Sequence, residues 1–133
     1  MRNYFTSFLA FICVDSIWLL LIAPTMYRQS IGHLMQDQAD LVAALLFYLI
    51  FLWGLNVFVI QAHRLSSPKK VMQHAALFGF VTYATFDLTS VAVFKDFPYW
   101  LAGVDLMWGA TLSTLVTFIT LYFDPVRAQH MAR

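Results

Sequence analysis

The chain of 133 residues is 61% hydrophobic and only 11% charged, with a mean hydropathy of +0.71. This composition excludes an ordinary soluble protein and predicts an integral membrane protein, with room for a single domain over residues 1–133. The single cysteine excludes a disulfide framework and a cysteine-based metal site. The net charge of +1 is uninformative as a total, and nothing in the sequence resembles a nucleic-acid-binding surface.

The first apolar run, residues 4–23, is long enough as a helix to cross ~30 Å of hydrocarbon. A cleaved signal peptide is the competing interpretation. Only Arg2 precedes the run, Asp15 lies in its middle, and no Ala-x-Ala-like cleavage site comes before Pro24. These features favour a retained transmembrane helix that ends at the proline.

Three further apolar runs follow, and they predict helices over residues 41–62, 75–94 and 99–123. The polar connection 25–40 has apolar residues at helical spacing, which is compatible with a short interfacial helix. The tight connection 95–98 makes the last two helices antiparallel neighbours. Continuous apolar runs of this length are too long for barrel strands, so the predicted fold is an all-α, four-helix membrane bundle.

The distribution of Lys and Arg predicts the orientation of these helices. One side of the predicted topology carries Arg2, Arg64, Lys69, Lys70, Arg127 and Arg133, and the other carries Arg28 and Lys95. Because basic residues collect on the cytoplasmic side, both termini are expected in the cytoplasm. Tyr27, Tyr99 and Trp100 would then lie near the outer interface.

Three aspartates lie inside the predicted spans, although a charged group there costs ~3 kcal/mol or more. Asp15, Asp87 and Asp105 lie eight, seven and six residues from the expected outer ends of their helices. At 1.5 Å per residue these depths are ~9 to 12 Å. The three carboxyls are therefore expected to form one cluster in the outer half of the bundle, stabilised by protons, a cation or hydrogen bonds.

Aromatic and hydroxyl side chains adjoin the aspartates at helical spacing. Tyr83 lies one turn before Asp87, and each of the other two aspartates is followed three residues later by a tryptophan that could donate its N–H or cover a cavity. The candidate ligand-binding or proton-relay residues are Asp15, Asp87, Asp105, Trp18, Trp108, Tyr83 and Thr89.

The remaining polar residues are expected to have structural roles. Asn56 is expected to be a hydrogen-bonding contact between helices, with Gly54 allowing close approach, and Gly103 and Gly109 are expected to be packing positions. Solvated or interfacial positions, rather than metal ligation, are expected for His33, His63, His74 and His130. No motif for a known cofactor is present.

At these residues the sequence resembles a bacterial family of small predicted membrane proteins, domain of unknown function 2177. The matching elements are Asp15-x-x-Trp18, Pro24 and Tyr27, residues 47–54, Tyr83-Ala-Thr-Phe-Asp-Leu-Thr89 and Asp105-x-x-Trp108-Gly109. Where that family usually has Tyr and Asn around the Thr-Phe-Asp-Leu-Thr core, this chain has Phe86 and Ser90. The resemblance implies four helices in a bacterial inner membrane and favours a lipid-related role, and it brings no established activity.

Three functions are compatible with these features. The first is a module that binds or transports a proton, a cation or a small amphipathic molecule through the aspartate cluster. The second is a membrane enzyme, or an accessory subunit, that modifies lipids or fatty acids, with the carboxyls as acid and base or as ligands of Mg²⁺ or Mn²⁺. The third is a structural helper in which the aspartates join the helices. Membrane lipid is the expected partner, and the sequence leaves a protein partner or a homo-oligomer open.

Overall fold

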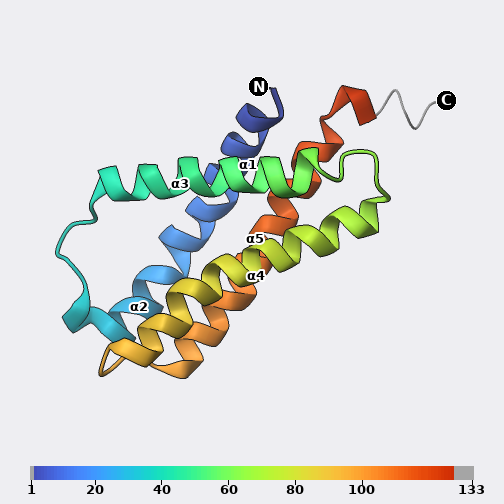
Figure 1. Ribbon diagram of the computed structural model, residues 1–133. Coiled ribbons are helices and arrows are strands. Elements are labelled where there is room, and N and C mark those ends of the chain that lie inside the picture. The colour runs from blue at the N-terminus through green and yellow to red at the C-terminus, as the bar shows by residue number, and fades with distance from the viewer. Residues whose placement is uncertain (1, 128–133) are drawn as a thin grey trace.

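In the computed structural model, which describes residues 2–127, the chain is almost entirely helical and no strand occurs in that range (Figure 1). Four helices are long and apolar enough to cross a membrane, so the all-α, four-helix prediction is confirmed. The helical elements are α1 (Arg2–Leu21), α2 (Ala23–Ile31), α3 (Leu41–Leu55), α4 (Pro68–Val93) and α5 (Tyr99–Tyr122), with a 3₁₀ turn at Gly32–Leu34 and a π-helical turn at Asn56–Gln61. Two residues considered above, His130 and Arg133, lie outside the described residues.

The connection after α1 is itself helical. Pro24 lacks an N–H and cannot donate to the carbonyl of Leu20, so the chain turns there and α2 starts at Ala23. Phe97, Leu101 and Ala102 form a small apolar core, against which Tyr27 and other residues of α2 pack. The short helix is therefore held over the end of the bundle where α4 passes into α5.

The starts of α3 and α4 are determined by local chemistry. The side chain of Asp40 accepts hydrogen bonds from the backbone N–H groups of Val42 and Ala43 at 2.9 and 3.1 Å, as an N-cap does. α4 begins at Pro68, seven residues before the expected start at residue 75, because proline is favoured in the first helical turn, where its missing N–H costs nothing. The basic residues Lys69 and Lys70 therefore belong to the first turn of α4.

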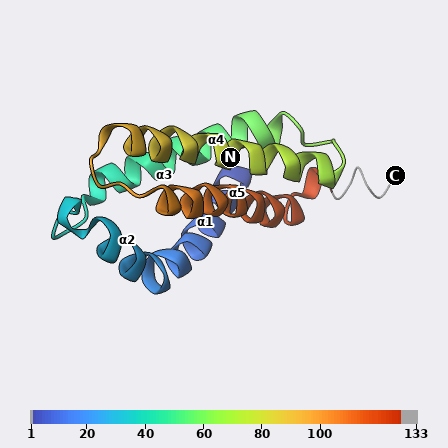
Figure 2. The ribbon, with the colours of Figure 1, turned by 90° about the horizontal axis from the view of Figure 1, so that it is seen from below.

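The last helix is the centre of the bundle. Half of the α5 span is buried, a larger share than in any other spanning helix of the described chain. Figure 2 shows α5 between α4 and α1, and Figure 1 shows α3 and α4 diverging from their connection. The helices α4 and α5 pack along their length as antiparallel neighbours, as their short connection predicts.

Two glycines allow α4 and α5 to approach closely. A Cβ atom at Gly79 would overlap the carbonyl oxygen of Gly109 and the hydroxyl of Ser113, and a Cβ at Gly109 would overlap the ring of Tyr83. Gly109 is therefore a packing position, as expected. Around Gly103, by contrast, there is open space, so the prediction that it packs is wrong.

The apolar side chains divide into a core and a membrane-facing surface. The core includes Phe11, Leu52 and Leu112, all fully buried. Many large apolar side chains are exposed instead, among them Leu41 at 78% and Leu20 at 76%. Exposure of this extent matches the hydrocarbon of a membrane and not water.

An ion-pair network joins three segments at the end of the molecule where α1 begins and α5 ends. The Asp124 carboxylate is fully buried and accepts two hydrogen bonds from the Arg64 guanidinium, at 2.5 and 2.6 Å, and one from the Asn3 amide at 3.0 Å. Arg127 donates to the carbonyl oxygens of Arg64 and Ser66, both at 3.1 Å. The donors from Arg64 are the main reason why the pKa of Asp124 is lowered to about 2.

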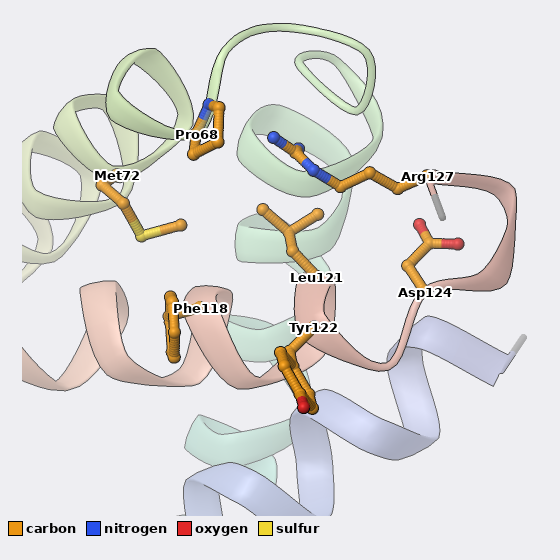
Figure 3. Close-up of a pocket in the computed structure, with 7 residues that line it drawn as sticks. All are labelled: Pro68, Met72, Phe118, Leu121, Tyr122, Asp124 and Arg127. Carbon is orange, nitrogen blue, oxygen red and sulfur yellow. The ribbon is translucent and has the colours of Figure 1, made fainter. Parts of the chain in front are cut away.

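A surface cavity of about 270 Å³ lies beside this network, between α4 and α5. Figure 3 shows Asp124 and Arg127 at one side of it, with Leu121 and Phe118 of α5 below and Pro68 and Met72 of α4 opposite. The buried carboxylate at this end of the molecule therefore lies next to an opening in the surface.

Candidate functional site: a buried carboxyl pair

Two of the three intramembrane aspartates lie together. Asp87 of α4 is fully buried and Asp105 of α5 is 2% exposed, and the two residues line the same cavity. The Tyr27 hydroxyl of α2 donates a hydrogen bond to Asp105. Within residues 2–127 no donor reaches either oxygen of Asp87. A carboxylate in this position requires a shared proton or a cation.

The close crossing of α4 and α5 brings these two aspartates together. Asp87 lies about two turns beyond Gly79 on α4, and Asp105 lies about one turn before Gly109 on α5. Because the helices are antiparallel, the two aspartates both lie on the same side of the glycine contact, toward one end of the bundle. The glycines have no side chains, so the helix axes stay close together there and the two carboxyls meet instead of facing separate surfaces.

A cavity of about 270 Å³ opens at the pair, where α3 diverges from α4. Its walls are largely aromatic, and its polar groups are the two carboxyls, a threonine and two tyrosines. The lining residues are Tyr27, Phe47, Thr82, Tyr83, Phe86, Asp87 and Asp105. A space of this size can hold a small organic molecule whose polar group reaches the carboxyls.

Asp15 has partners of its own and is not part of the pair. Its carboxyl accepts a hydrogen bond from the Tyr48 hydroxyl of α3 at 3.1 Å and one from the Trp108 indole of α5 at 3.4 Å. These contacts connect α1 to α3 and α5 at a buried position. Tyr83 is close enough to interact electrostatically with Asp15 and with both carboxyls of the pair.

The two tryptophans have different roles. The Trp108 indole donates across to Asp15 on α1, not to Asp105 on its own helix. Trp18 stacks on Trp108, with ring centroids 4.5 Å apart and an interplanar angle of 9°. The stack reinforces the contact between α1 and α5 and does not line the cavity at the pair.

The structure does not bring Thr89 into the site. Its side chain is exposed on α4 and donates to the backbone carbonyls of Thr85 and Phe86. Two residues along an α-helix correspond to a rotation of about 200°, so a residue two positions after Asp87 faces away from it. Thr89 therefore lies on an exposed face of α4, outside the cavity at Asp87 and Asp105.

Asn56 lies outside the site. Its amide donates to the Ser7 hydroxyl of α1 at 2.7 Å and to the carbonyl of Leu52 at 2.9 Å. It thus connects the π-helical turn to α1, as expected of a hydrogen-bonding contact between helices. The ring of Phe78 would lie 3.1 Å from a Cβ at Gly54, so this glycine accommodates a close neighbour on α4.

Sequence reasoning missed two tyrosines that hold the carboxyls. Tyr27 was expected at the outer interface, but it points inward and donates to Asp105. Burial and the contact with Asp105 raise the pKa of Tyr27, so its hydroxyl remains a donor at neutral pH. The signal for both tyrosines was their presence in segments of the family resemblance, at Tyr27 itself and within residues 47–54 for Tyr48.

No group of three or more His, Cys, Asp or Glu side chains in the described part of the chain is arranged to hold a metal ion. The proposed Mg²⁺ or Mn²⁺ site required three carboxyls, and Asp15 is engaged elsewhere.

Replacing Tyr27 by phenylalanine is expected to lower the free energy of unfolding by about 1–2 kcal/mol, because Asp105 loses a buried donor. Thermal unfolding in detergent measures the effect. Tyr99→Phe is the matched control, since Tyr99 is 79% exposed and its change is expected to be neutral. Equal stability of the two variants would contradict a role for Tyr27 in holding Asp105.

These features define a four-helix integral membrane protein with a buried carboxyl pair between two of its spanning helices. The chain belongs to the family described as predicted membrane protein (DUF2177), whose model matches residues 1–122. Comparisons with curated proteins and with solved structures gave no match. The functional assignment therefore rests on the chemistry of the buried carboxyls.

Proposed function

We propose that the protein binds a small amphipathic cation at the Asp87–Asp105 pair and exchanges it for the proton that the pair shares when the cation is absent. The observation that carries this proposal is the Asp87 carboxyl, which is fully buried and has no donor from residues 2–127. A group of this kind is costly in a membrane, and protons or cations are its usual partners.

The walls of the cavity support a cationic ligand with an apolar body. Phe47, Tyr83 and Phe86 supply aromatic surface beside the two carboxyls. Aromatic faces attract cations, most strongly where water is excluded, and cages of such rings recognise quaternary ammonium groups. A carboxylate and several rings together thus favour an organic cation over a neutral molecule of the same shape.

The pair belongs to the outer half of a bacterial inner-membrane protein in this proposal, with both termini cytoplasmic. The basic residues Arg64, Lys69, Lys70 and Arg127 lie at the end of the molecule away from the pair. Only Arg28 and Lys95 lie in the connections at the other end. The positive-inside rule then directs the end with the cavity at Asp87 and Asp105 to the outside.

The test is calorimetric titration of the purified protein with benzyltrimethylammonium, a small aromatic cation. We expect binding to the parent, with release of about one proton per bound cation as measured in two buffers of different ionisation enthalpy. Asp87→Asn and Asp105→Asn are each expected to weaken binding by at least tenfold, about 1.4 kcal/mol, because an amide offers no negative charge.

Two controls make the test specific. Asp37→Asn removes a carboxylate from an exposed connection and is expected to leave the binding of the cation unchanged. Neopentylbenzene has the shape of the cation without its charge, and it is expected not to compete. The proposal fails if the neutral molecule competes as well as the cation, or if both pair variants bind the cation like the parent. Unfolding of both variants without a separable loss of binding would favour the structural-helper alternative.

A further inference from the structure

A stripe of buried polar residues runs along α5 from the carboxyl pair to the opposite end of the molecule. It consists of Ser113, Thr117 and Thr120, which are spaced at three and four residues and thus share one helix face. None of the three is more than 1% exposed. We call these three residues the polar seam. Between Asp105 and Asp124, which flank it, the helix rises ~28 Å, close to the thickness of the hydrocarbon core.

Two hydroxyl groups of the polar seam, those of Ser113 and Thr117, differ from the other hydroxyls of the helix. Thr111 is exposed and Thr114 is half-buried, and each donates to the backbone carbonyl four residues earlier, at 2.8 and 2.7 Å. Thr120 of the seam does the same, to the carbonyl of Val116 at 2.7 Å. Ser113 and Thr117 are fully buried, yet their oxygens have no hydrogen-bonding partner within residues 2–127. Ordered water is the usual partner of buried hydroxyl groups that have none within the protein.

The seam is continuous with the carboxyl pair through the crossing of α4 and α5. The Ser113 hydroxyl occupies the space that a side chain at Gly79 would fill. One turn further along α4, Tyr83 lies against Gly109 and close to the carboxyls of the pair. Tyr83 therefore bridges the step from Ser113 to Asp87 and Asp105.

At its other end the seam reaches an opening in the surface. Thr120 is one turn from Asp124, which lines the surface cavity shown in Figure 3. Asp124 is ionised at neutral pH because the donors from Arg64 hold its pKa at about 2. It is paired with Arg64 and does not carry a proton itself, but the cavity that it lines connects this end of the seam to the surface.

We propose that the polar seam is a proton path, in which water beside Ser113, Thr117 and Thr120 connects the surface cavity at Asp124 to Tyr83 and the Asp87–Asp105 pair. This inference rests on the proposed function, because it supplies the route by which the proton of the pair reaches the other side of the membrane. Each oxygen along the path accepts one proton and passes another on, so one proton moves and no covalent heavy-atom bond changes.

The experiment measures proton flux into liposomes that contain the full chain, with an internal pH dye and a potassium gradient clamped by valinomycin. Thr117→Val keeps the shape of the side chain and removes its hydroxyl, and Ser113→Ala removes the other unpartnered hydroxyl. Each variant is expected to slow proton flux by at least about tenfold. The melting temperature is expected to be unchanged or higher, since a buried polar group without a partner is removed.

Thr114→Val is the matched control, because its hydroxyl bonds to its own helix outside the polar seam, and its flux is expected to equal that of the parent. Proton flux through Thr117→Val and Ser113→Ala at the rate of the parent overturns the proton path. So does a parent protein that binds benzyltrimethylammonium but carries no flux above empty liposomes. In both cases cation binding, measured separately by calorimetry, decides whether the carboxyl pair still functions as proposed.

Discussion

Replacing Gly79 by alanine is expected to destabilise the protein by up to about 2 kcal/mol and to abolish cation binding at the carboxyl pair. The new Cβ would overlap the backbone of Gly109, which cannot move aside as a flexible side chain would. Overpacking of this kind costs roughly 1–3 kcal/mol, and it outweighs the gain of about 1 kcal/mol that alanine brings to a helix. The two helices would separate, and Asp87 would move away from Asp105.

Gly103→Ala provides the matched control for this prediction. It places the same methyl group in α5, only two residues before Asp105, but in open space. With no overlap at this position, the only effect on stability is the higher helix propensity of alanine. The free energy of unfolding is therefore expected to be unchanged or to increase by up to about 1 kcal/mol. Thermal unfolding and titration with the cation measure both effects. If Gly79→Ala proves as stable and as competent in binding as Gly103→Ala, the close crossing does not organise the site.

Replacing Arg64 by alanine is expected to lower stability by about 3 kcal/mol, because it leaves the Asp124 carboxylate buried without its cation. The Asn3 amide and one backbone N–H remain as donors, and they compensate only in part. Lys69→Ala removes an exposed basic residue from the same end of the molecule and is expected to be neutral. Chemical or thermal unfolding in detergent compares the two variants.

The pH dependence of stability provides a second measurement of the same ion pair. The pKa of Asp124 lies at about 2 in the folded protein, below its ordinary value of 3.8. The carboxylate therefore contributes about 2 kcal/mol of stability above pH 3.8, and this contribution is lost as the pH falls toward 2. Arg64→Ala should reduce this loss, since the variant lacks the donors that lower the pKa. A fall of equal size in both proteins would show that other groups are responsible.

Several parts of the site could be predicted from the sequence, because ionisable residues are costly and therefore rare in apolar membrane-spanning segments. Asp87 and Asp105 were candidates on that basis alone, and their depths of seven and six residues from the expected outer ends of their helices agree with each other. Depth along a helix does not determine the direction in which a side chain points. For this reason Asp15 was grouped with the pair, although its carboxyl turns to Tyr48 and Trp108.

The partners of the aspartates could not be derived in the same way. Tyr27 lies in a polar connection whose position over the bundle depends on packing against Leu101 and its neighbours, 74 residues further along the chain. The ion pair between Arg64 and Asp124 is likewise formed by segments that meet only when the helices assemble. Neither contact leaves a periodic pattern in the sequence.

Hydropathy and the hydrogen-bonding needs of the backbone in hydrocarbon are properties of each segment, so they predict a four-helix membrane protein with costly carboxyls inside the membrane without knowledge of the fold. Which of those carboxyls lacks a partner depends on how the helices pack. That outcome depends on a close contact between two glycines on different helices, and on which hydroxyl groups turn inward along α5. Distances between helices are set by packing, so they are decided only when the whole chain is folded.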